Sequence, residues 1–478
     1  MRRLAFALVC SAVLSIVPLA VRRAGALGAA APAARTMRLD LYHTGGMGTE
    51  LFAVDRIVDD GPWAGSATRL LDDTGLGAYL FQVLDAASRR PLYSRGTSSL
   101  FGEWETTAEA KTARRTFHES FRFPWPAARV EVVVSRRDSR NAWKEVARIP
   151  VDPASEEVNP APPAGPGDVT VVFENGPPVS KVDLLLLGDG YTAAELPKFR
   201  KDAARMAEVL FRHEPFRGRR GDFNVRSAIL PSKESGIWRP SSRQYRRTPL
   251  SLQYGVFGSE RYVLATDNRA LRDLASLAPY DAVAVLVNEA RYGGGGIFGS
   301  QSTVTVDTAF ADYVFVHELG HAFAGLADEY YTVDVAYETG RKDLPEPWEP
   351  NVTALADPAA LKWRDLVEAA TPLPTPWDKE PFEERSRAVQ AERKRRLAEG
   401  ASPREIDALF RRQQQVETKA LSSMCFSGKV GAFEGAAYEA KGLYRPTADC
   451  IMFTRDEVGF CPVCRRAVER VIDLYARP

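Results

Sequence analysis

Hydrophobic and polar positions change their pattern about one third of the way along the chain. Before that point, short apolar runs at residues 39–42, 78–84 and 130–134 are separated by Gly, Pro and Asp clusters, without a long helical period. Short strand-like runs at this spacing are typical of two antiparallel sheets packed face to face. We therefore predict an antiparallel β-sandwich over residues 37–153.

After the change, apolar runs alternate with helical periods. Residues 182–187 form an apolar run typical of a buried strand, and Thr192 then begins a helical period that extends to Phe211. A second buried-strand run covers residues 282–287. Strands that alternate with helices predict an α/β domain, which we place at residues 169–478.

Two segments differ in composition from these domains. Residues 154–168 are rich in Pro, Gly and Ala and predict an interdomain linker without regular structure. Residues 379–415 are rich in Glu, Arg, Lys, Gln and Ala, with charges of both signs at helical spacing. This pattern favours a solvated helical insertion over a binding arm.

The N-terminus has the composition of a secretory signal peptide. Basic residues 2–3 precede an apolar run at residues 4–21 and a small-residue stretch at residues 24–30. This order predicts a cleaved leader at residues 1–26. An uncleaved membrane anchor is the alternative because the run approaches spanning length, but Pro18 and the small residues favour cleavage. We expect export without stable membrane insertion after cleavage.

The net charge of the chain mainly excludes one class of function. The 478 residues include 63 Lys and Arg against 62 Asp and Glu, a formal net charge of +1. Proteins that bind nucleic acid through phosphate contacts usually carry a clear basic excess. We therefore expect no nucleic-acid partner.

The chemistry is concentrated in one motif, because two of the five histidines lie four residues apart. His317 and His321 share a helix face, so both imidazoles can bind one zinc ion. Glu318 lies beside the position of a zinc-bound water, where a carboxylate acts as general base. This HExxH pattern is the signature of zincins.

A catalytic zinc needs a third protein ligand and leaves a fourth position open. No histidine follows His321, so the third ligand has to be another residue type. Gly325 can end the helix and let the chain turn back, and Asp328 and Glu329 follow at once. Both carboxylates are candidates.

The motifs together resemble a known family. The HExxH motif continues into residues 325–330, and further matches are found at 187–191, 292–296, 433–436, 444–446, 450–452 and 460–464, together with Asn288. The chain resembles the IgA-peptidase family of exported bacterial zinc metallopeptidases, metallopeptidase family sixty-four. Residues 101–107 also resemble the accessory domain that often precedes this peptidase. The resemblance implies a metzincin-like catalytic fold and a secreted or periplasmic bacterial protein.

Similarity to acid-terminated metzincin motifs makes Asp328 our predicted third zinc ligand, with Glu329 as the alternative. In some metzincins a tyrosine two residues beyond the methionine turn stabilises the transition state, but this chain has none there. Tyr444 or Arg445 is a candidate for that role.

The glycine run at residues 293–296 predicts either a flexible loop at the edge of a cleft or a turn after a buried strand.

Cys425, Cys450, Cys461 and Cys464 are the cysteines beyond the leader. In an exported chain they predict two disulfides or one four-thiolate zinc site, and the oxidising compartment favours disulfides. Similarity to archaemetzincins instead implies a second, structural zinc at the four cysteines and a methionine turn at Met452. An ordinary core methionine is the alternative reading of Met452.

The sequence thus predicts an α+β chain, with an N-terminal antiparallel β-sandwich followed by an α/β zincin, metzincin-like catalytic domain. We expect a zinc-dependent endopeptidase that hydrolyses protein or peptide substrates, with Glu318 as general base on a zinc-bound water. An extended peptide would add itself as a strand to the edge of the catalytic sheet. The alternatives are an exported binding or adhesion protein with a structural metal site, or a zinc amidase acting on cell-wall peptides.

Overall fold

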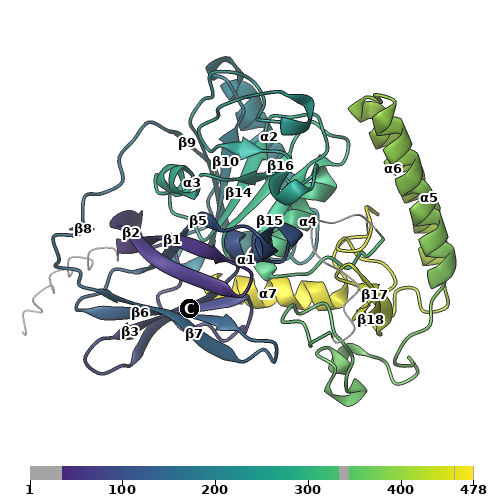
Figure 1. Ribbon diagram of the computed structural model, residues 1–478, viewed down its shortest axis with the longest axis horizontal. Coiled ribbons are helices and arrows are strands. Elements are labelled where there is room, and N and C mark those ends of the chain that lie inside the picture. The colour runs from purple at the N-terminus through teal and green to yellow at the C-terminus, as the bar shows by residue number, and fades with distance from the viewer. Residues whose placement is uncertain (1–34, 333–343, 457, 477–478) are drawn as a thin grey trace, which may run out of the picture. The chain divides into compact units, whose positions relative to one another are not determined.

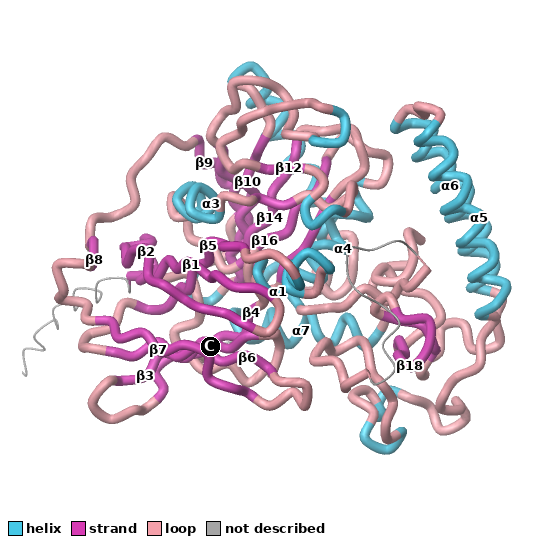
Figure 2. Tube along the Cα trace, in the orientation of Figure 1, coloured by secondary structure: helices cyan, strands magenta, loops and turns pink. Residues whose placement is uncertain are grey.

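The computed structural model describes residues 35–332, 344–456 and 458–476, and the leader predicted over residues 1–26 lies outside them. The described chain is a mixed α+β structure with several sheets (Figure 1, Figure 2). None of its helices is both long and apolar enough to cross a lipid bilayer.

The N-terminal part is built mainly from strands. These are β1 (Arg35–Gly46), β2 (Thr49–Pro62), β3 (Tyr79–Asp85), β4 (Pro91–Thr97), β5 (Arg115–Pro124), β6 (Val130–Arg137), β7 (Trp143–Val151) and β8 (Val158–Asn159). A short helix, α1 (Leu100–Glu105), lies between β4 and β5. The strands form two sheets, in the orders β5-β1-β2-β8 and β4-β3-β6-β7.

Alternating side chains of both sheets form one hydrophobic core. Leu39 and Phe121 from the first sheet pack with Phe81 and Val132 from the second. The pairs are antiparallel except for β2 with β8. A β domain at this end of the chain agrees with the alternation of apolar and polar residues.

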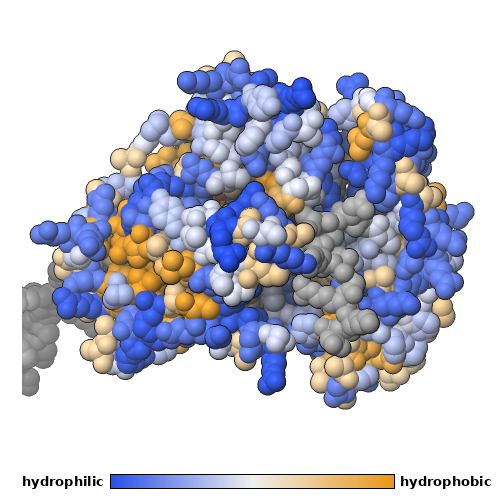
Figure 3. Space-filling view, viewed as in Figure 1, coloured by the Kyte–Doolittle hydropathy of each residue, from blue (hydrophilic) through white to orange (hydrophobic). Residues whose placement is uncertain are grey.

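In Figure 3, hydrophobic residues gather over the part of the surface where Figure 1 draws β1 and β2, and Leu51 and Val54 of β2 are exposed.

The prediction that residues 154–168 lack regular structure is wrong in two places, because Asp168 begins β9 and a two-residue strand lies inside the segment. Val158 and Asn159 form β8 and extend the first sheet as a parallel edge strand. The Val158 side chain is buried in the sandwich core, and this burial stabilises the pairing of the short segment with β2. The linker therefore begins as part of the β domain.

The rest of the chain combines strands with longer helices. The strands are β9 (Asp168–Phe173), β10 (Val182–Asp189), β11 (Phe223–Ile229), β12 (Leu252–Gln253), β13 (Leu264–Ala265), β14 (Ala282–Val287), β15 (Gly294–Ile297), β16 (Gln301–Thr305), β17 (Phe433–Ala436) and β18 (Glu439–Arg445). The helices are α2 (Leu196–Leu210), α3 (Asn268–Ala275), α4 (Ala311–Ala324), α5 (Lys379–Ala398), α6 (Pro403–Ser422) and α7 (Pro462–Ala476).

One six-stranded sheet organises this part, in the order β15-β16-β14-β10-β11-β9. Its central strands are parallel, whereas β15 and β9 at the two edges are antiparallel to their neighbours. Leu184 and Leu186 of β10 pack on the face covered by α2, α4 and α7, and Leu185 and Leu187 pack on the face covered by α3. Burial on both faces explains the continuous apolar run in the sequence.

The charged segment predicted as a helical insertion forms the α5–α6 hairpin, which extends beyond residue 415 to Ser422. The hairpin is less solvated than its composition suggests. Phe382 and Phe410 are buried, and the Phe410 ring packs against Phe310, at the start of α4. The segment therefore belongs to the wall of the structure beside α4.

Candidate active site

Helix α4 carries the HExxH motif and is held in place by its apolar face. Val314, Phe315, Leu319 and Phe323 of the helix are buried in the core beside the six-stranded sheet. The helix ends at Gly325, whose φ of 61° is left-handed, and a Cβ at this position would lie 2.8 Å from the Trp348 ring. Glycine is therefore required at the point where the sequence predicted the helix to end.

The glycine run next to α4 is an edge strand, so neither the loop nor the turn predicted for it is right. A Cβ on Gly294 would lie 2.6 Å from the Val314 side chain, and a Cβ on Gly296 would lie 2.4 Å from the backbone of Glu318. Only glycine lets β15 approach the helix this closely. Both glycines line the cleft above the motif.

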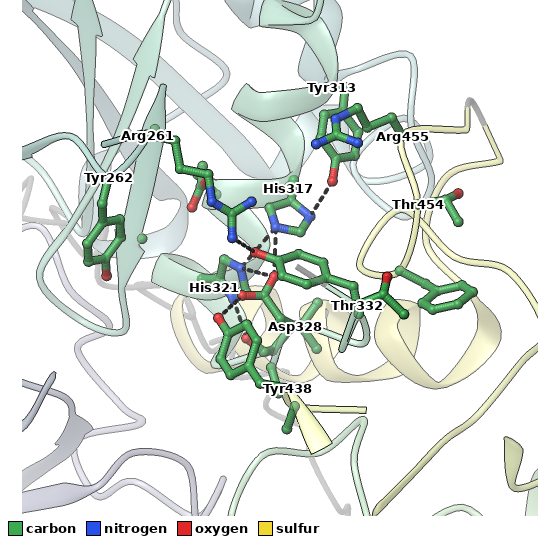
Figure 4. A pocket seen from close by; sticks show the side chains of 18 of the residues that line it. Arg261, Tyr262, Tyr313, His317, His321, Asp328, Thr332, Tyr438, Thr454 and Arg455 are labelled. Atoms are coloured by element: carbon green, nitrogen blue, oxygen red, sulfur yellow. Dashed lines mark hydrogen bonds and ion pairs between the residues drawn. The ribbon is translucent and has the colours of Figure 1, made fainter. Parts of the chain in front are cut away.

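Three side chains converge at the floor of this cleft (Figure 4). Oδ1 of Asp328 lies 3.0 Å from Nε2 of His317 and 3.2 Å from Nε2 of His321, and the two Nε2 atoms are 3.1 Å apart. His317 and Asp328 are buried, whereas His321 is partly exposed toward the cleft. The structure thus brings together the three residues predicted to bind zinc.

The outer nitrogens of both imidazoles are held by the backbone. Nδ1 of His317 donates to the carbonyl of Ile451 at 2.9 Å, and Nδ1 of His321 donates to the carbonyl of Leu326. Because a carbonyl oxygen only accepts, the proton of each neutral ring lies on Nδ1. In the neutral form of each ring, Nε2 therefore presents a lone pair to the common centre, as a metal ligand requires.

The side chains of this group change one another's pKa. Burial disfavours the charged imidazolium of His321, but the Asp328 carboxylate outweighs burial and raises the pKa of His321 to about 9. Burial also acts on Asp328, yet the two histidines lower the pKa of its carboxyl well below the usual value. Burial raises the pKa of Glu318, against the influence of the same histidines. Glu318 also lines the cleft.

Tyr438 contacts this group and was not predicted from the sequence. Its hydroxyl donates to Oδ2 of Asp328 (Figure 4). Tyr438 and Ala437 form the two-residue turn between β17 and β18, with φ of 66° and 47°. Left-handed φ is uncommon for such residues and is found where the surrounding structure enforces it. Here the turn is fixed by hydrogen bonds from its two N–H groups to the carbonyls of Asp328 and Tyr330.

Glu329, the alternative third ligand, faces a different group. It lies with Cys450, Cys461 and Cys464, and the ligand atoms of these four residues are all within 4.8 Å of one another. Oε1 of Glu329 is 3.3 Å from Sγ of Cys464 and accepts from Asn351 at 3.0 Å. Oε2 is buried and has no hydrogen-bond partner among the residues that the structure describes.

The cysteine predictions need two corrections. Cys425 is exposed and lies outside the group, so the set of four thiolates is wrong and Glu329 takes the fourth place. The disulfides favoured by the compartment argument are not formed, since the four cysteines are free and the Sγ atoms of Cys450 and Cys464 are 3.9 Å apart. The buried thiols are arranged around a shared centre with the carboxylate instead of being paired.

Met452 lies in the turn that follows Cys450 and is fully buried. A Cβ on Gly320, the residue before His321, would lie 3.1 Å from Sδ of Met452. The backbone carbonyl of Met452 accepts from the N–H of Glu329 at 2.8 Å. The methionine therefore packs directly against the motif helix, where a methionine turn was predicted.

The two predicted transition-state donors lie elsewhere. Arg445 is fully buried, donates to the carbonyl of Gly435 at 2.8 Å and stacks 3.7 Å above the Phe453 ring. The backbone of Tyr444 pairs with Thr353. Neither residue lines the cleft, so this prediction is wrong.

Groups from three parts of the chain border the cleft. Ser98 and Glu103 come from the end of β4 and from α1, and Ser386 and Gln390 come from α5. The N-terminal domain and the helical hairpin, both distant from the motif in sequence, thus form walls of the same cleft. Tyrosine side chains line it as well, including Tyr438.

An HExxH helix whose histidines meet a carboxylate at the floor of a cleft is the arrangement of a metal-dependent peptidase. Comparison with known families agrees, because the family model described as IgA Peptidase M64 matches residues 170–472 and the one described as Peptidase M64 N-terminus matches residues 30–147. The chain belongs to the M64 peptidase family, which confirms the resemblance seen in the sequence. No curated protein matches the chain.

The family establishes the class of reaction. The protein is a metallopeptidase that hydrolyses peptide bonds, so its substrate is a protein or a peptide. This excludes a role as a binding protein without enzymatic activity, which was one of the alternatives left open by the sequence.

Proposed function

We propose that this protein is an exported zinc endopeptidase with a metzincin-like catalytic domain, in which His317, His321 and Asp328 bind the catalytic zinc and Glu318 is the general base. The observation that carries the proposal is the convergence of the two Nε2 atoms and the Asp328 carboxylate within 3.2 Å of one another at the floor of a cleft.

The donor set fits zinc. Two neutral imidazoles and one carboxylate are a usual set of protein ligands in a catalytic zinc site, with one position left for water or substrate. Both rings are oriented by backbone carbonyls, and Asp328 is oriented by the Tyr438 hydroxyl. Such outer contacts fix the direction of ligand lone pairs.

When bound, zinc would polarise the scissile carbonyl and lower the pKa of water near it. Glu318 would take the proton of the attacking water and later deliver it to the leaving amine. Its position on α4 directly after His317 places the carboxylate in the cleft while the two histidines face the common centre.

Strand β15 offers a place for an extended peptide. Gly294 already exchanges hydrogen bonds with Arg261 and Val263 on its side away from β16. Backbone groups alternate along a strand, so the N–H and C=O of Gly296 point to the same outer side. We propose that a substrate strand pairs with Gly296, beside the backbone of Glu318.

We further propose a second, structural zinc held by Glu329, Cys450, Cys461 and Cys464. Three thiolates and one carboxylate would supply four protein ligands and leave no open position, and closed sets rich in thiolate are typical of structural zinc. The orphaned, buried Oε2 of Glu329 supports this site, because a buried carboxylate oxygen without a partner is costly.

Export rests on the N-terminal sequence. The basic start, the apolar run and the small residues up to residue 26 support a cleaved signal peptide and a secreted or periplasmic bacterial protein. Fractionation of cells that express the full chain, followed by N-terminal sequencing of the exported form, tests this. A mature chain that begins near residue 27 is expected, and an uncleaved cytoplasmic chain would reject export.

Hydrolysis of casein by the zinc-loaded mature chain tests the peptidase, with purified cell-wall peptide as a parallel substrate to test the amidase alternative. We expect internal cleavage of casein by the native chain and none by Glu318→Ala with the same zinc content. Release of cell-wall peptides with intact casein would favour the amidase.

A further inference from the structure

A second pocket opens beside the active-site cleft, between the α5–α6 hairpin and the segment before β13. The cleft and this side pocket share the lining residues Arg261, Tyr292, Gln390 and Arg455. A group bound in the side pocket would therefore be continuous with a chain that occupies the cleft. Figure 4 shows Arg261 beside His317, and Arg455 near Tyr313 on the same side of the site.

Positive charge dominates the walls of this pocket. Four arginines line it, and the acidic residues lining it are Glu260 and Asp407. Glu260 forms an ion pair with Arg291. The buried carboxylate of Asp407 accepts from the backbone N–H of Ala309 at 3.0 Å, just before α4. Each acid thus has another partner, although Glu260 also interacts electrostatically with Arg393.

The remaining guanidiniums, Arg261, Arg393 and Arg455, form no ion pair with a carboxylate in the part of the chain that the structure describes. Arg261 donates to the hydroxyl of Tyr330 at 3.1 Å. Arg455 stacks 4.0 Å above the Phe410 ring, and its buried Nε has no hydrogen-bond partner within residues 35–332, 344–456 and 458–476. Burial, together with the like charges of Arg261 and Arg455, lowers the pKa of Arg393.

Carboxylates outside the side pocket also act on two of these arginines, because Asp328 and Glu318 of the active site interact electrostatically with Arg261. Glu417 lines the larger cleft and is close enough to Arg455 to interact with it electrostatically. Gln413 donates to Glu417 at 2.7 Å, and burial raises the pKa of this carboxyl. Like Asp328 and Glu318, it stands outside the side pocket, so no described carboxylate that lines this pocket forms an ion pair with Arg261, Arg393 or Arg455.

The other walls are apolar and come from Leu397, Ile406 and Phe410. Guanidiniums above an apolar wall suit an anion on a short aliphatic stem, because planar N–H donors bind carboxylates while the stem is removed from water. An uncharged side chain would leave the arginines in this half-buried space without a counter-ion.

We propose that this side pocket is a specificity subsite that binds a carboxylate of the substrate peptide. The proposal rests on the proposed endopeptidase function. The carboxylate has two sources, an Asp or Glu side chain near the scissile bond or the C-terminal carboxylate of a short peptide. Binding one of them would favour cleavage at a fixed distance from an acidic group.

The test is the cleavage profile of the zinc-loaded mature chain on a proteome-derived peptide library, read by mass spectrometry. We expect Asp and Glu to be enriched about tenfold at one position relative to the cleaved bond, since a hydrogen bond to a charged group is worth about one such factor. A second library with amidated C-termini separates the sources. If the preference is instead for sites at a fixed distance from the free C-terminus, amidation abolishes it.

Substitutions connect the preference to the pocket. Arg393→Gln should reduce the enrichment toward one, and Arg393→Glu, whose carboxylate would take the place of the substrate's beside Arg261 and Arg455, should abolish it. Arg387→Gln is the matched control, because Arg387 lies on the same helix, is exposed and lines neither cavity. It should keep the native profile.

The outcomes of these experiments test the carboxylate subsite separately from the proposed peptidase function. Cleavage by the native chain without any acidic or C-terminal preference overturns the subsite and leaves the peptidase intact. An enrichment that survives both Arg393 substitutions in folded protein also overturns it. If Arg393 variants do not fold, the native profile alone decides. Absence of any cleavage overturns the proposed function and the subsite together.

Discussion

Two groups of ligating side chains lie next to each other and differ in almost every property. His317, His321 and Asp328 supply nitrogen and oxygen, line the cleft and have Glu318 beside them. The group of Glu329 with Cys450, Cys461 and Cys464 supplies mainly sulfur, and none of its members lines the cleft. The side chain of His321 is 15% exposed, whereas Glu329 is 0% exposed.

The comparison shows how one short segment serves two purposes. Asp328 and Glu329 are consecutive, yet each completes a different group. An open site with a nearby base suits catalysis, and a closed site rich in thiolate suits structure. The two carboxylates are therefore not interchangeable, although the sequence alone offered both for the same position.

The second group also supports the first through the backbone. Glu329 donates its N–H to the carbonyl of Met452, and the neighbouring carbonyl of Ile451 accepts from Nδ1 of His317. Cys450 immediately precedes these two residues. A metal that ties Glu329 to Cys450 would therefore hold in place the segment that orients His317.

Loss of a thiolate from the cysteine group should have the largest effect on stability of all the substitutions considered. Cys464→Ser is expected to lower the free energy of unfolding by more than about 4 kcal/mol, because a structural metal site contributes directly to folding. Thermal unfolding followed by circular dichroism measures this. Cys425→Ser is the matched control, since Cys425 is exposed and outside the group, and its melting temperature should stay native. Equal stability of the two variants would reject a structural site.

Glu318→Ala should act on turnover alone. Removal of a general base is expected to lower kcat/KM for casein-derived peptides by about 10²–10⁴-fold. Zinc content and melting temperature should remain native, because Glu318 is not a ligand in this account. Native turnover in the zinc-loaded variant would show that Glu318 is not the general base.

Substitution of each of the adjacent carboxylates, Asp328 and Glu329, tests whether they serve different metal sites. Asp328→Ala should weaken zinc binding at the open site more than about hundredfold, since even loss of an outer contact costs ten- to hundredfold. It should leave the melting temperature nearly native when the second site is filled. Glu329→Ala should instead lower the melting temperature. Titration with a zinc chelator, read together with thermal unfolding, checks both, and the reverse pattern would exchange the two roles.

The smallest effect is expected at Tyr438. Tyr438→Phe removes the hydrogen bond to Asp328 and keeps the ring, so zinc affinity at the open site should fall about tenfold. Tyr444→Phe is the control, because Tyr444 lies outside the cleft. Unchanged affinity in Tyr438→Phe would show that the hydroxyl does not orient the ligand.

Local signals in the sequence predicted much of this arrangement. The buried strands β10 and β14, the motif helix and its end at Gly325 follow from apolar runs, periodicity and a glycine after the last turn. The convergence of Asp328 with the histidines follows from the same turn.

Other features depend on contacts between distant segments, which periodicity does not encode. Glu329 turns to cysteines more than a hundred residues away, and Tyr438 reaches Asp328 through a hairpin turn without the glycine or asparagine typical of left-handed φ. The α5–α6 hairpin has the composition of a solvated surface, yet it forms a wall of the cleft. Such docking is set by tertiary packing.

The most direct test of the account is the amount and coordination of zinc in the folded mature chain, measured by elemental analysis and zinc X-ray absorption. Two zinc atoms per chain are predicted, one with nitrogen and oxygen ligands and one with three sulfur ligands and one oxygen. In Cys464→Ser the sulfur signal should be lost, whereas in Asp328→Ala it should remain. A single zinc per native chain without sulfur ligands would contradict the two-site account.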